Sequence, residues 1–329
     1  MIKLANYIFS KLPQVEIAVR VAYWKSDLVH SYMQRFKRRS TKSDEASNAS
    51  LERSNKPNVA LREVESELIK HGVEKGSILI VHSSMQKLSR TGATPSEIID
   101  MLLNLVGEAG TLVMPAIPKY KEAASLAAGI DRVSVDLSEE VWTYNVKKTP
   151  PWTGALPYKL MKTEGARRGR HPLNTVVAKG FHVSEMFARE LSVPHSLPCG
   201  PESPWAYCAK HNAKVVALGV DLAHSLTMIH VAEDCYESEW PVKNWYRNRK
   251  FLVVDHEQEQ IVEVRERHPK WAMHYSERKL DHDLARHGIS CKTMVGDIAI
   301  TSVDSEALLR FLNCRKAKGY PYYLWSMSQ

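Results

Sequence analysis

The chain of 329 residues lacks the cysteine patterns that mark metal-binding or disulfide-rich proteins. It has five cysteines, an odd number, and no two of them form a C-x-x-C pair. They are Cys199, Cys208, Cys235, Cys291 and Cys314. With no Cys/His cluster at zinc spacing either, the sequence predicts free thiols in a reducing compartment and no metal site.

Long apolar runs and nucleotide-binding glycine loops are missing as well. No apolar run reaches the ~20 residues that a helix needs to cross a bilayer, and the N-terminus has no apolar core followed by a small-residue cleavage site. Neither G-x-x-x-x-G-K-S/T nor a G-x-G-x-x-G after a strand occurs. We therefore expect a cytoplasmic protein that binds its ligands without either of the two common nucleotide loops.

Positive charge is present but unevenly spread. Lys and Arg total 45 against 37 Asp and Glu, a net charge of +8. Four of the basic residues gather near the start, at Arg35, Lys37, Arg38 and Arg39. Basic proteins often meet nucleic acid or anionic lipid. We interpret the charge here as a solvated surface with a basic tail, and predict no nucleic-acid partner.

The first 57 residues are predicted to be an extension outside the main domain. Apolar residues recur at roughly helical spacing over residues 1 to about 36. Residues 37–57 are almost entirely polar, a composition typical of a linker. Residues 1–39 suit two roles: a peripheral contact with the inner membrane face, or packing on the main domain or on a partner subunit, as in a homodimer.

Residues 58–329 are predicted to form one α/β domain. A helix begins at Leu61 and ends at Gly72, and a buried strand covers Ile78–Val81. Thr94 and Glu97 form a capping box at the start of the next helix, and a strand covers Thr111–Met114. Helices alternating with strands place helices on the faces of a sheet.

The pattern continues in the second half of the domain. A strand over Val215–Val220 precedes a helix from about Leu226 to Cys235. Phe251–Val254 and Ile261–Val264 read as two antiparallel strands joined by a polar turn. A last amphipathic helix covers Ser305–Leu312.

Polar residues directly follow the first strand. His82, Ser83 and Ser84 stand where the carboxyl ends of strands collect ligands in open α/β sheets. Hydroxyl and backbone N–H groups at such a place suit a phosphate or a pantetheine amide. The alternative is that the two serines only shape a turn.

A histidine and a glutamate stand three residues apart on the helix after Val220. His230 and Glu233 therefore share one helix face. An imidazole oriented by a carboxylate is an effective general base near neutral pH. The alternative is a surface pair, with Asp234 as a competing partner of the histidine.

Other candidate residues carry two interpretations each. Arg170 and His171 lie in a basic stretch that either contacts phosphates or forms an exposed loop. Ser203 before Pro204 suits a ligand loop or a plain helix cap. Four aromatic residues either wall a cleft or belong to the core. These are Trp240, Trp245, Trp271 and Tyr275.

Taken together and in order, these motifs resemble the aminoglycoside 3-N-acetyltransferase family, which is unrelated to the GNAT fold. The resemblance runs from about Val73 to Leu312. Its landmarks are Val81-His82-Ser83-Ser84-Met85, Gly110-Thr111-Leu112-Val113-Met114-Pro115, Thr149-Pro150-Pro151-Trp152-Thr153-Gly154-Ala155-Leu156-Pro157, Arg170-His171-Pro172, Gly200-Pro201-Glu202-Ser203-Pro204, Leu218-Gly219-Val220 and Thr227-Met228-Ile229-His230-Val231-Ala232-Glu233.

The resemblance implies an α/β/α sandwich around a large mixed sheet and acetyl transfer from acetyl-CoA to an amine of an aminoglycoside or amino sugar. It implies His230 as the catalytic base, Glu233 as its acidic partner, and Thr227 beside the thioester. It also implies that CoA binds at the Ser83–Ser84 turn and Ser203. His82, Arg170 and His171 complete the predicted cofactor-binding set, and no metal is required.

Two alternatives differ from drug acetylation. The basic character of the chain favours an anionic acceptor, such as a nucleotide-linked or lipid-linked amino sugar in surface-polysaccharide biosynthesis. The cations expected near the site are Arg167, Arg168, Lys243, Arg247 and Arg249. From another class, the chain could be a non-catalytic CoA-binding or scaffold protein that keeps the fold.

Overall fold

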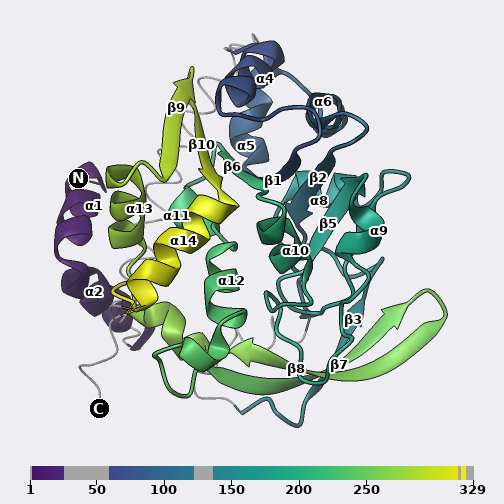
Figure 1. Ribbon diagram of the computed structural model, residues 1–329, viewed down its shortest axis with the longest axis vertical. Helices are drawn as coiled ribbons and strands as arrows, with labels where there is room; N and C mark the ends of the chain where they lie inside the picture. The colour runs from purple at the N-terminus through teal and green to yellow at the C-terminus, as the bar shows by residue number, and fades with distance from the viewer. Residues whose placement is uncertain (1, 26–58, 122–135, 318–319, 324–329) are drawn as a thin grey trace.

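The computed structural model describes residues 2–25, 59–121, 136–317 and 320–323. Its centre is a seven-stranded mixed sheet (Figure 1). In spatial order the strands are β4 (Arg167–Arg168), β5 (Val176–Gly180), β2 (Thr111–Pro115), β1 (Ile78–Ser83), β6 (Lys214–Leu218), β10 (Ile298–Asp304) and β9 (Ser290–Val295). β1 pairs in parallel with β2 and β6, and the remaining pairs are antiparallel.

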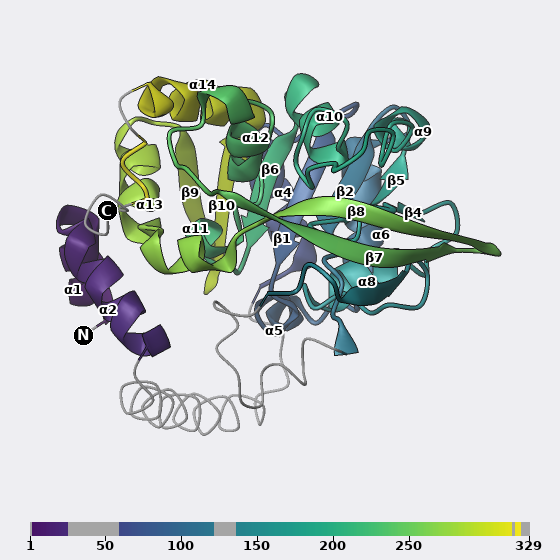
Figure 2. The same cartoon turned by 90° about the horizontal axis from the view of Figure 1, so that it is seen from below.

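Helices cover both faces of this sheet, because its central strands are apolar on both sides. In β1, Ile78 and Ile80 enter one hydrophobic cluster, and Leu79 and Val81 enter the other. One face packs α4 (Leu61–Lys70), α6 (Pro95–Val106) and α8 (Ala155–Leu160); the other packs α10 (Pro204–Lys210), α12 (Ile229–Asp234) and α14 (Ser305–Lys316) (Figure 2). This is the predicted α/β/α sandwich.

Local sequence signals set several helix ends. The Thr94 hydroxyl accepts the backbone N–H of Glu97 at 3.3 Å, and the Glu97 carboxylate accepts the N–H of Thr94 at 2.7 Å. The predicted capping box is therefore confirmed at the start of α6. Gly107 ends α6 with φ of 67°, and Gly72 follows α4 with φ of 81°, conformations in which glycine has no steric penalty.

The predicted helix from Leu226 to Cys235 is wrong at its first turn. The chain instead forms α11 (Leu222–Ser225) and then α12, separated at Leu226 by a ψ of 70°. The Asp221 side chain caps α11 by accepting the N–H of Ala223 at 3.0 Å. This cap starts the helical stretch earlier than the apolar pattern indicates, and the break lets α12 begin in a new direction.

A second, three-stranded sheet packs beside the first. It consists of β3 (Val141–Asn145), β7 (Tyr246–Asp255) and β8 (Gln258–Arg267). β7 and β8 are antiparallel as predicted but longer, because their polar ends continue the backbone ladder. The turn between them is short, with His256 at φ of 56°. The Arg249 guanidinium lies 4.2 Å from the centre of the Trp142 ring beneath this sheet.

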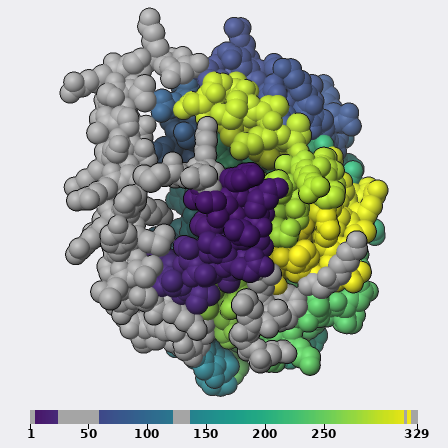
Figure 3. Space-filling model, turned by 90° about the vertical axis from the view of Figure 1, so that its left-hand side faces the viewer, coloured from purple at the N-terminus to yellow at the C-terminus, as the bar shows by residue number. Residues whose placement is uncertain are grey.

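The N-terminal helices pack on the body of the molecule (Figure 3). α1 (Ile2–Lys11) and α2 (Pro13–Lys25) contact α13 (Glu277–Arg286) and the 3₁₀ helix η3 (Pro269–His274). The buried Glu16 carboxylate accepts the Ser276 hydroxyl at 3.0 Å and the Arg278 N–H at 3.3 Å. The extension thus packs on the main domain, one of the arrangements expected for it.

Other parts of the extension lie outside the described residues, including the basic run Arg35–Arg39 and the polar stretch 37–57. The domain boundary at residue 57 and the membrane contact stay predictions. Among the helices that the structure describes, none combines the length and apolarity that a membrane crossing needs. The remaining short elements are α5 (Met85–Leu88), η1 (Ser89–Thr91), α9 (Val183–Met186) and η2 (Glu237–Glu239).

Candidate active site

A cavity of about 170 Å³ lies beside the start of α12. Its wall comes from segments that are far apart in the sequence: α2, α11, the turn into α12, the end of β8, and the residues around η3. The polar and charged residues that line it include Arg20, His224, Thr227, His230, Arg267 and Glu277. The chain enters this region directly from β6, whose carboxyl end is next to that of β1.

Of the predicted pair, His230 lines this cavity, and Glu233 is buried beside it, outside the lining. The imidazole Nδ1 lies 2.8 Å from the Glu233 carboxylate, as expected for residues three apart on a helix. The Glu233 side chain is 1% exposed and the His230 side chain 15% exposed. Thr227 is one turn earlier, and its carbonyl accepts the backbone N–H of His230 at 3.0 Å. The three predicted catalytic residues are therefore brought together.

Sequence reasoning missed a third charged group, Arg267. One guanidinium nitrogen lies 2.6 Å from His230 Nδ1 and 3.2 Å from the Glu233 carboxylate. The same nitrogen donates to the Tyr323 hydroxyl at 3.1 Å, and that hydroxyl donates to Glu233 at 3.2 Å. Arg267 ends β8 and Tyr323 lies near the C-terminus, so no local motif connects either residue with the histidine.

The electrostatics of this cluster keep His230 neutral. Burial lowers the pKa of His230, and the positive charge of Arg267 lowers it further, against the opposing effect of Glu233. Burial alone would raise the pKa of Glu233, but His230 and Arg267 outweigh it and the pKa is lowered. The Glu233 carboxylate can only accept a hydrogen bond and the Arg267 N–H can only donate one, so the two compete for Nδ1 of His230. When Nδ1 donates its proton to Glu233, Nε2 is the proton acceptor of the ring.

Asp234, the competing partner, points elsewhere. Its carboxylate accepts the Cys199 backbone N–H at 3.0 Å and the Tyr246 hydroxyl at 2.8 Å. Burial raises the pKa of Asp234 to about 7, and the neighbouring Glu233 charge adds to this effect. Asp234 therefore ties the 199 loop and β7 to α12, and Glu233 is the residue that orients His230.

The serines predicted to bind the cofactor lie outside the lining of the cavity. Ser83 pairs with Leu218 across β1 and β6, so the expected sheet edge is confirmed. Ser84 caps α5 by accepting the Lys87 N–H at 3.4 Å, and Ser203 caps α10 by accepting the Ala206 N–H at 3.1 Å. Both caps have a structural explanation, and a role in binding CoA stays a prediction.

The other three predicted cofactor residues are also away from the cavity. His82 and His171 are buried, and burial lowers the pKa of each to about 4. The His82 ring stacks near Trp205, with 6.5 Å between ring centres, and its Nε2 has no hydrogen-bond partner among the described residues. Arg170 lies 3.2 Å from Gln260 on the β8 hairpin. Their roles in binding CoA likewise stay predictions.

The aromatic residues form the wall behind the cavity and part of the core. Trp240, Trp245 and Trp271 are at most 9% exposed and pack with Tyr320 and Tyr323. Tyr275 stacks on Tyr323, with 4.9 Å between ring centres, and lines the cavity. Both interpretations of the predicted group are thus partly correct: its three tryptophans belong to the core, and its one tyrosine, Tyr275, lines the cavity.

The cations expected near the site are a different set from those observed. None of the five predicted arginines and lysines lines the cavity, whose guanidinium groups are those of Arg20 and Arg267. Arg168 instead donates to three backbone carbonyls, including Thr149 and Ala116 at 2.5 Å. Arg167 and Arg168 form β4 at one edge of the large sheet, and Arg247 and Arg249 lie in β7 of the second sheet, outside the lining of the cavity.

Within the described ranges, no group of three or more His, Cys, Asp or Glu side chains is arranged to hold a metal ion. What the cavity offers is a neutral imidazole, a buried carboxylate, two guanidinium groups and the Thr227 hydroxyl. Fold and site together define an α/β protein with a cavity lined by groups that are capable of acid–base chemistry.

Comparison with known proteins assigns the family. The model of the aminoglycoside 3-N-acetyltransferase family matches residues 80–315. Aminoglycoside N(3)-acetyltransferase IX of Micromonospora chalcea is 30% identical over 181 residues, which cover 52% of this chain and 60% of that protein. Aminoglycoside N(3)-acetyltransferase III of Serratia marcescens is 30% identical over 169 residues, covering 49% of this chain and 59% of that protein.

The fold agrees with a solved member of the same group. The structure of AAC-IIIb in binary complex with CoASH superposes with a TM-score of 0.64 at 20% identity, covering 79% of this chain and 97% of that one. The matched sequence spans about three fifths of the length of the two curated relatives. This chain belongs to the aminoglycoside 3-N-acetyltransferase family.

Proposed function

We propose that this protein is an N-acetyltransferase that transfers the acetyl group of acetyl-CoA to an amine of an aminoglycoside or another amino sugar. Membership of the family supports the reaction class, and the CoASH complex of a structural neighbour supports the donor. The observation that carries the proposal is the hydrogen bond of 2.8 Å between the buried Glu233 and His230, whose side chain lines the cavity.

In this proposal His230 removes the proton that prevents the acceptor amine from reacting. A sugar amine is mostly an ammonium ion at neutral pH, and an ammonium ion has no lone pair for attack. The neutral imidazole accepts the proton at Nε2. Glu233 fixes the ring and stabilises the imidazolium that forms, as the carboxylate of a catalytic triad does.

Arg267 and Thr227 complete the arrangement. The guanidinium beside Nδ1 disfavours a protonated resting state of His230 and keeps Glu233 ionised. Among the residues that the structure describes, the Thr227 hydroxyl makes only a long hydrogen bond of 3.4 Å, to the Ser225 carbonyl. It is therefore available to donate to the acyl oxygen, on which negative charge grows during the reaction.

The size of the cavity suits the reacting ends of two substrates. Its volume of about 170 Å³ is below the ~300–1,000 Å³ that encloses a drug-sized ligand. Acetyl-CoA supplies a thioester whose thiolate leaves readily. We place the rest of the donor along the sheet edge at Ser83, Ser84 and Ser203, with His82, Arg170 and His171 nearby. Residues 58–329 then form the acetyltransferase domain.

The direct test is to replace His230 by asparagine. We expect kcat to fall by about 10²–10⁴-fold, the usual contribution of a general base, while CoA binding measured by calorimetry is retained. Thiol release from acetyl-CoA, with a panel of aminoglycosides and amino sugars, reports the rate. His256→Asn is the matched control, because His256 is exposed and has the positive φ that asparagine tolerates.

Two outcomes would contradict the proposal. A His230→Asn variant that turns over near the wild-type rate removes the histidine from the role of base. Wild-type protein that binds CoA but acetylates no amine in the panel is instead a non-catalytic CoA-binding protein.

A further inference from the structure

The N-terminal extension reaches the proposed active site. Arg20 of α2 lines the same cavity as His230 and Thr227, and its side chain is 24% exposed. The segment that carries Arg20 precedes the region matched by the family model, which begins at residue 80. A residue outside the matched region is thus part of the cavity wall.

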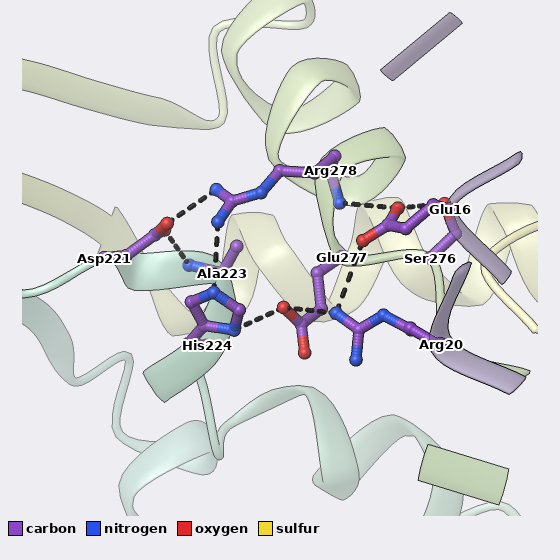
Figure 4. Close-up of polar contacts among 8 residues, drawn as sticks. All are labelled: Glu16, Arg20, Asp221, Ala223, His224, Ser276, Glu277 and Arg278. Carbon is purple, nitrogen blue, oxygen red and sulfur yellow. Dashed lines mark hydrogen bonds and ion pairs between the residues drawn. The ribbon is translucent and has the colours of Figure 1, made fainter. Parts of the chain in front are cut away.

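Arg20 is held in place by two carboxylates through one of its nitrogens. Nη2 lies 2.7 Å from the Glu277 carboxylate and 3.3 Å from that of Glu16 (Figure 4). Glu16 is itself fixed by Ser276 and by the backbone of Arg278. The guanidinium is therefore positioned before any ligand binds, which reduces the entropy that a ligand contact would cost.

The rest of the Arg20 guanidinium is available to a ligand. A guanidinium presents five N–H donors in a planar fork, and both ion pairs of Arg20 use Nη2. In Figure 4 the other terminal nitrogen points away from Glu16 and carries no dashed line. Within the described part of the chain, Nη1 and Nε have no hydrogen-bond partner, so these donors of a cavity-lining residue remain for a ligand.

The guanidinium groups of the cavity are more exposed than the carboxylates with which they pair. The side chains of Glu16 and Glu277 are 4% and 12% exposed, less than the 24% of Arg20. Likewise Glu233 is 1% exposed and Arg267 30%. In both clusters the carboxylates are enclosed and the guanidinium is the more accessible partner. A ligand therefore meets the N–H donors of Arg20 and Arg267, beside the less exposed Glu277 carboxylate that also lines the cavity.

We propose that Arg20 and Arg267 bind an anionic group, a phosphate or a carboxylate, on the amino-sugar acceptor, and that α2 is part of the acceptor site. Guanidinium forks bind such groups with two parallel hydrogen bonds. A polycationic acceptor would instead place ammonium groups against like charge. This inference rests on the proposed function and narrows its acceptor class.

The test compares acceptors that differ in one group. The probes are glucosamine 6-phosphate, 2-amino-2-deoxyglucuronic acid and glucosamine, offered to the full chain with acetyl-CoA. We expect the anionic sugars to have the lower KM. Arg20→Gln should raise the KM of the anionic acceptors about tenfold, the effect of losing one charge-assisted contact, with little change in kcat and none for glucosamine.

Two further variants separate the charge of Arg20 from its structural role. Arg20→Lys keeps the charge but not the fork, and should recover part of the affinity. Arg310→Gln makes the same change of net charge on α14, where Arg310 is 71% exposed and pairs only with Glu306 among the described residues. It should behave as wild type. Whichever of the two anionic sugars has the larger increase in KM in Arg20→Gln identifies the group, phosphate or carboxylate, that Arg20 binds.

The outcomes distinguish this inference from the proposed function. If Arg20→Gln changes the KM of all three sugars equally, or if glucosamine or kanamycin is the preferred acceptor, the anionic subsite is wrong while the acetyltransferase stands. If no amine is acetylated, calorimetry with the same three sugars still tests the subsite. Weaker binding of the two anionic sugars, but not of glucosamine, by Arg20→Gln than by wild type supports it. Equal binding by the two proteins overturns it.

Discussion

Replacing Glu233 by glutamine tests how the cluster at the cavity works. The substitution keeps the shape of the side chain and removes its charge. Glu233 accepts from His230, Arg267 and Tyr323 at 2.8, 3.2 and 3.2 Å and is 1% exposed. The glutamine amide can donate to Nδ1, which would put the imidazole proton on Nε2 and leave no base facing the substrate.

We expect two effects of known size. Losing the correct tautomer should lower kcat by about 10²–10⁴-fold. The variant also leaves the Arg267 guanidinium without its carboxylate partner. An unpaired buried charge costs about 3–5 kcal/mol of unfolding free energy. Because Arg267 is 30% exposed and water can reach it, the lower end, about 3 kcal/mol, is the expectation for this protein.

The pH dependence gives a third readout. Glu233 raises the pKa of His230, so removing its charge disfavours the imidazolium. The acidic limb of kcat/KM should therefore move to lower pH in the variant. Thiol release measured between pH 5 and 9, together with urea unfolding, reports all three effects. A variant within about threefold of the wild-type rate, with an unmoved limb, would refute this account of Glu233. Glu263→Gln, at a partly exposed position on β8, is the control.

Two other predictions concern stability. Burial raises the pKa of Glu190 to about 7, whereas the ordinary pKa of a glutamate is ~4.5. Between these two pH values the folded state binds more protons than the unfolded state, so the free energy of unfolding falls as pH rises. The Glu190→Gln variant stays neutral, so between pH 5 and pH 8 its unfolding free energy, measured by urea titration, should fall less than that of the wild type. Glu164→Gln, at an exposed position, is the control and should behave as wild type. An equal fall in all three proteins would contradict the claim that Glu190 titrates while buried. Thr94→Ala removes half of the capping box of α6 and should cost about 1 kcal/mol, measured by urea unfolding; an unchanged midpoint would show that the cap does not contribute.

The site illustrates how one helix depends on distant parts of the chain. α12 supplies His230 and Glu233, but their protonation states depend on Arg267 from β8. The wall of the cavity includes the ion pair of Arg20 and Glu277, which are more than 250 residues apart in the sequence. A variant in α2 can therefore change acceptor binding although it lies far from the histidine in sequence.

Local sequence determined a large part of the fold. The capping box of α6, the glycine after α4 and the apolar run of β1 act over a few residues, so each could be identified from neighbours alone. The spacing of His230 and Glu233 on one helix face is equally local. The collinear motifs also indicated the family, because their order along the chain does not require coordinates.

Only the tertiary structure decided which charges meet in the cavity. Arg267 and Tyr323 bind Glu233 from segments that no pattern in the sequence connects, and Arg20 arrives from an extension that the sequence also allowed at a membrane. The break at Leu226 likewise depends on how α11 and α12 pack, since the apolar spacing continues through it. Hydrophobic periodicity reports which face of an element is buried; it carries no information about which distant polar group lies opposite that face.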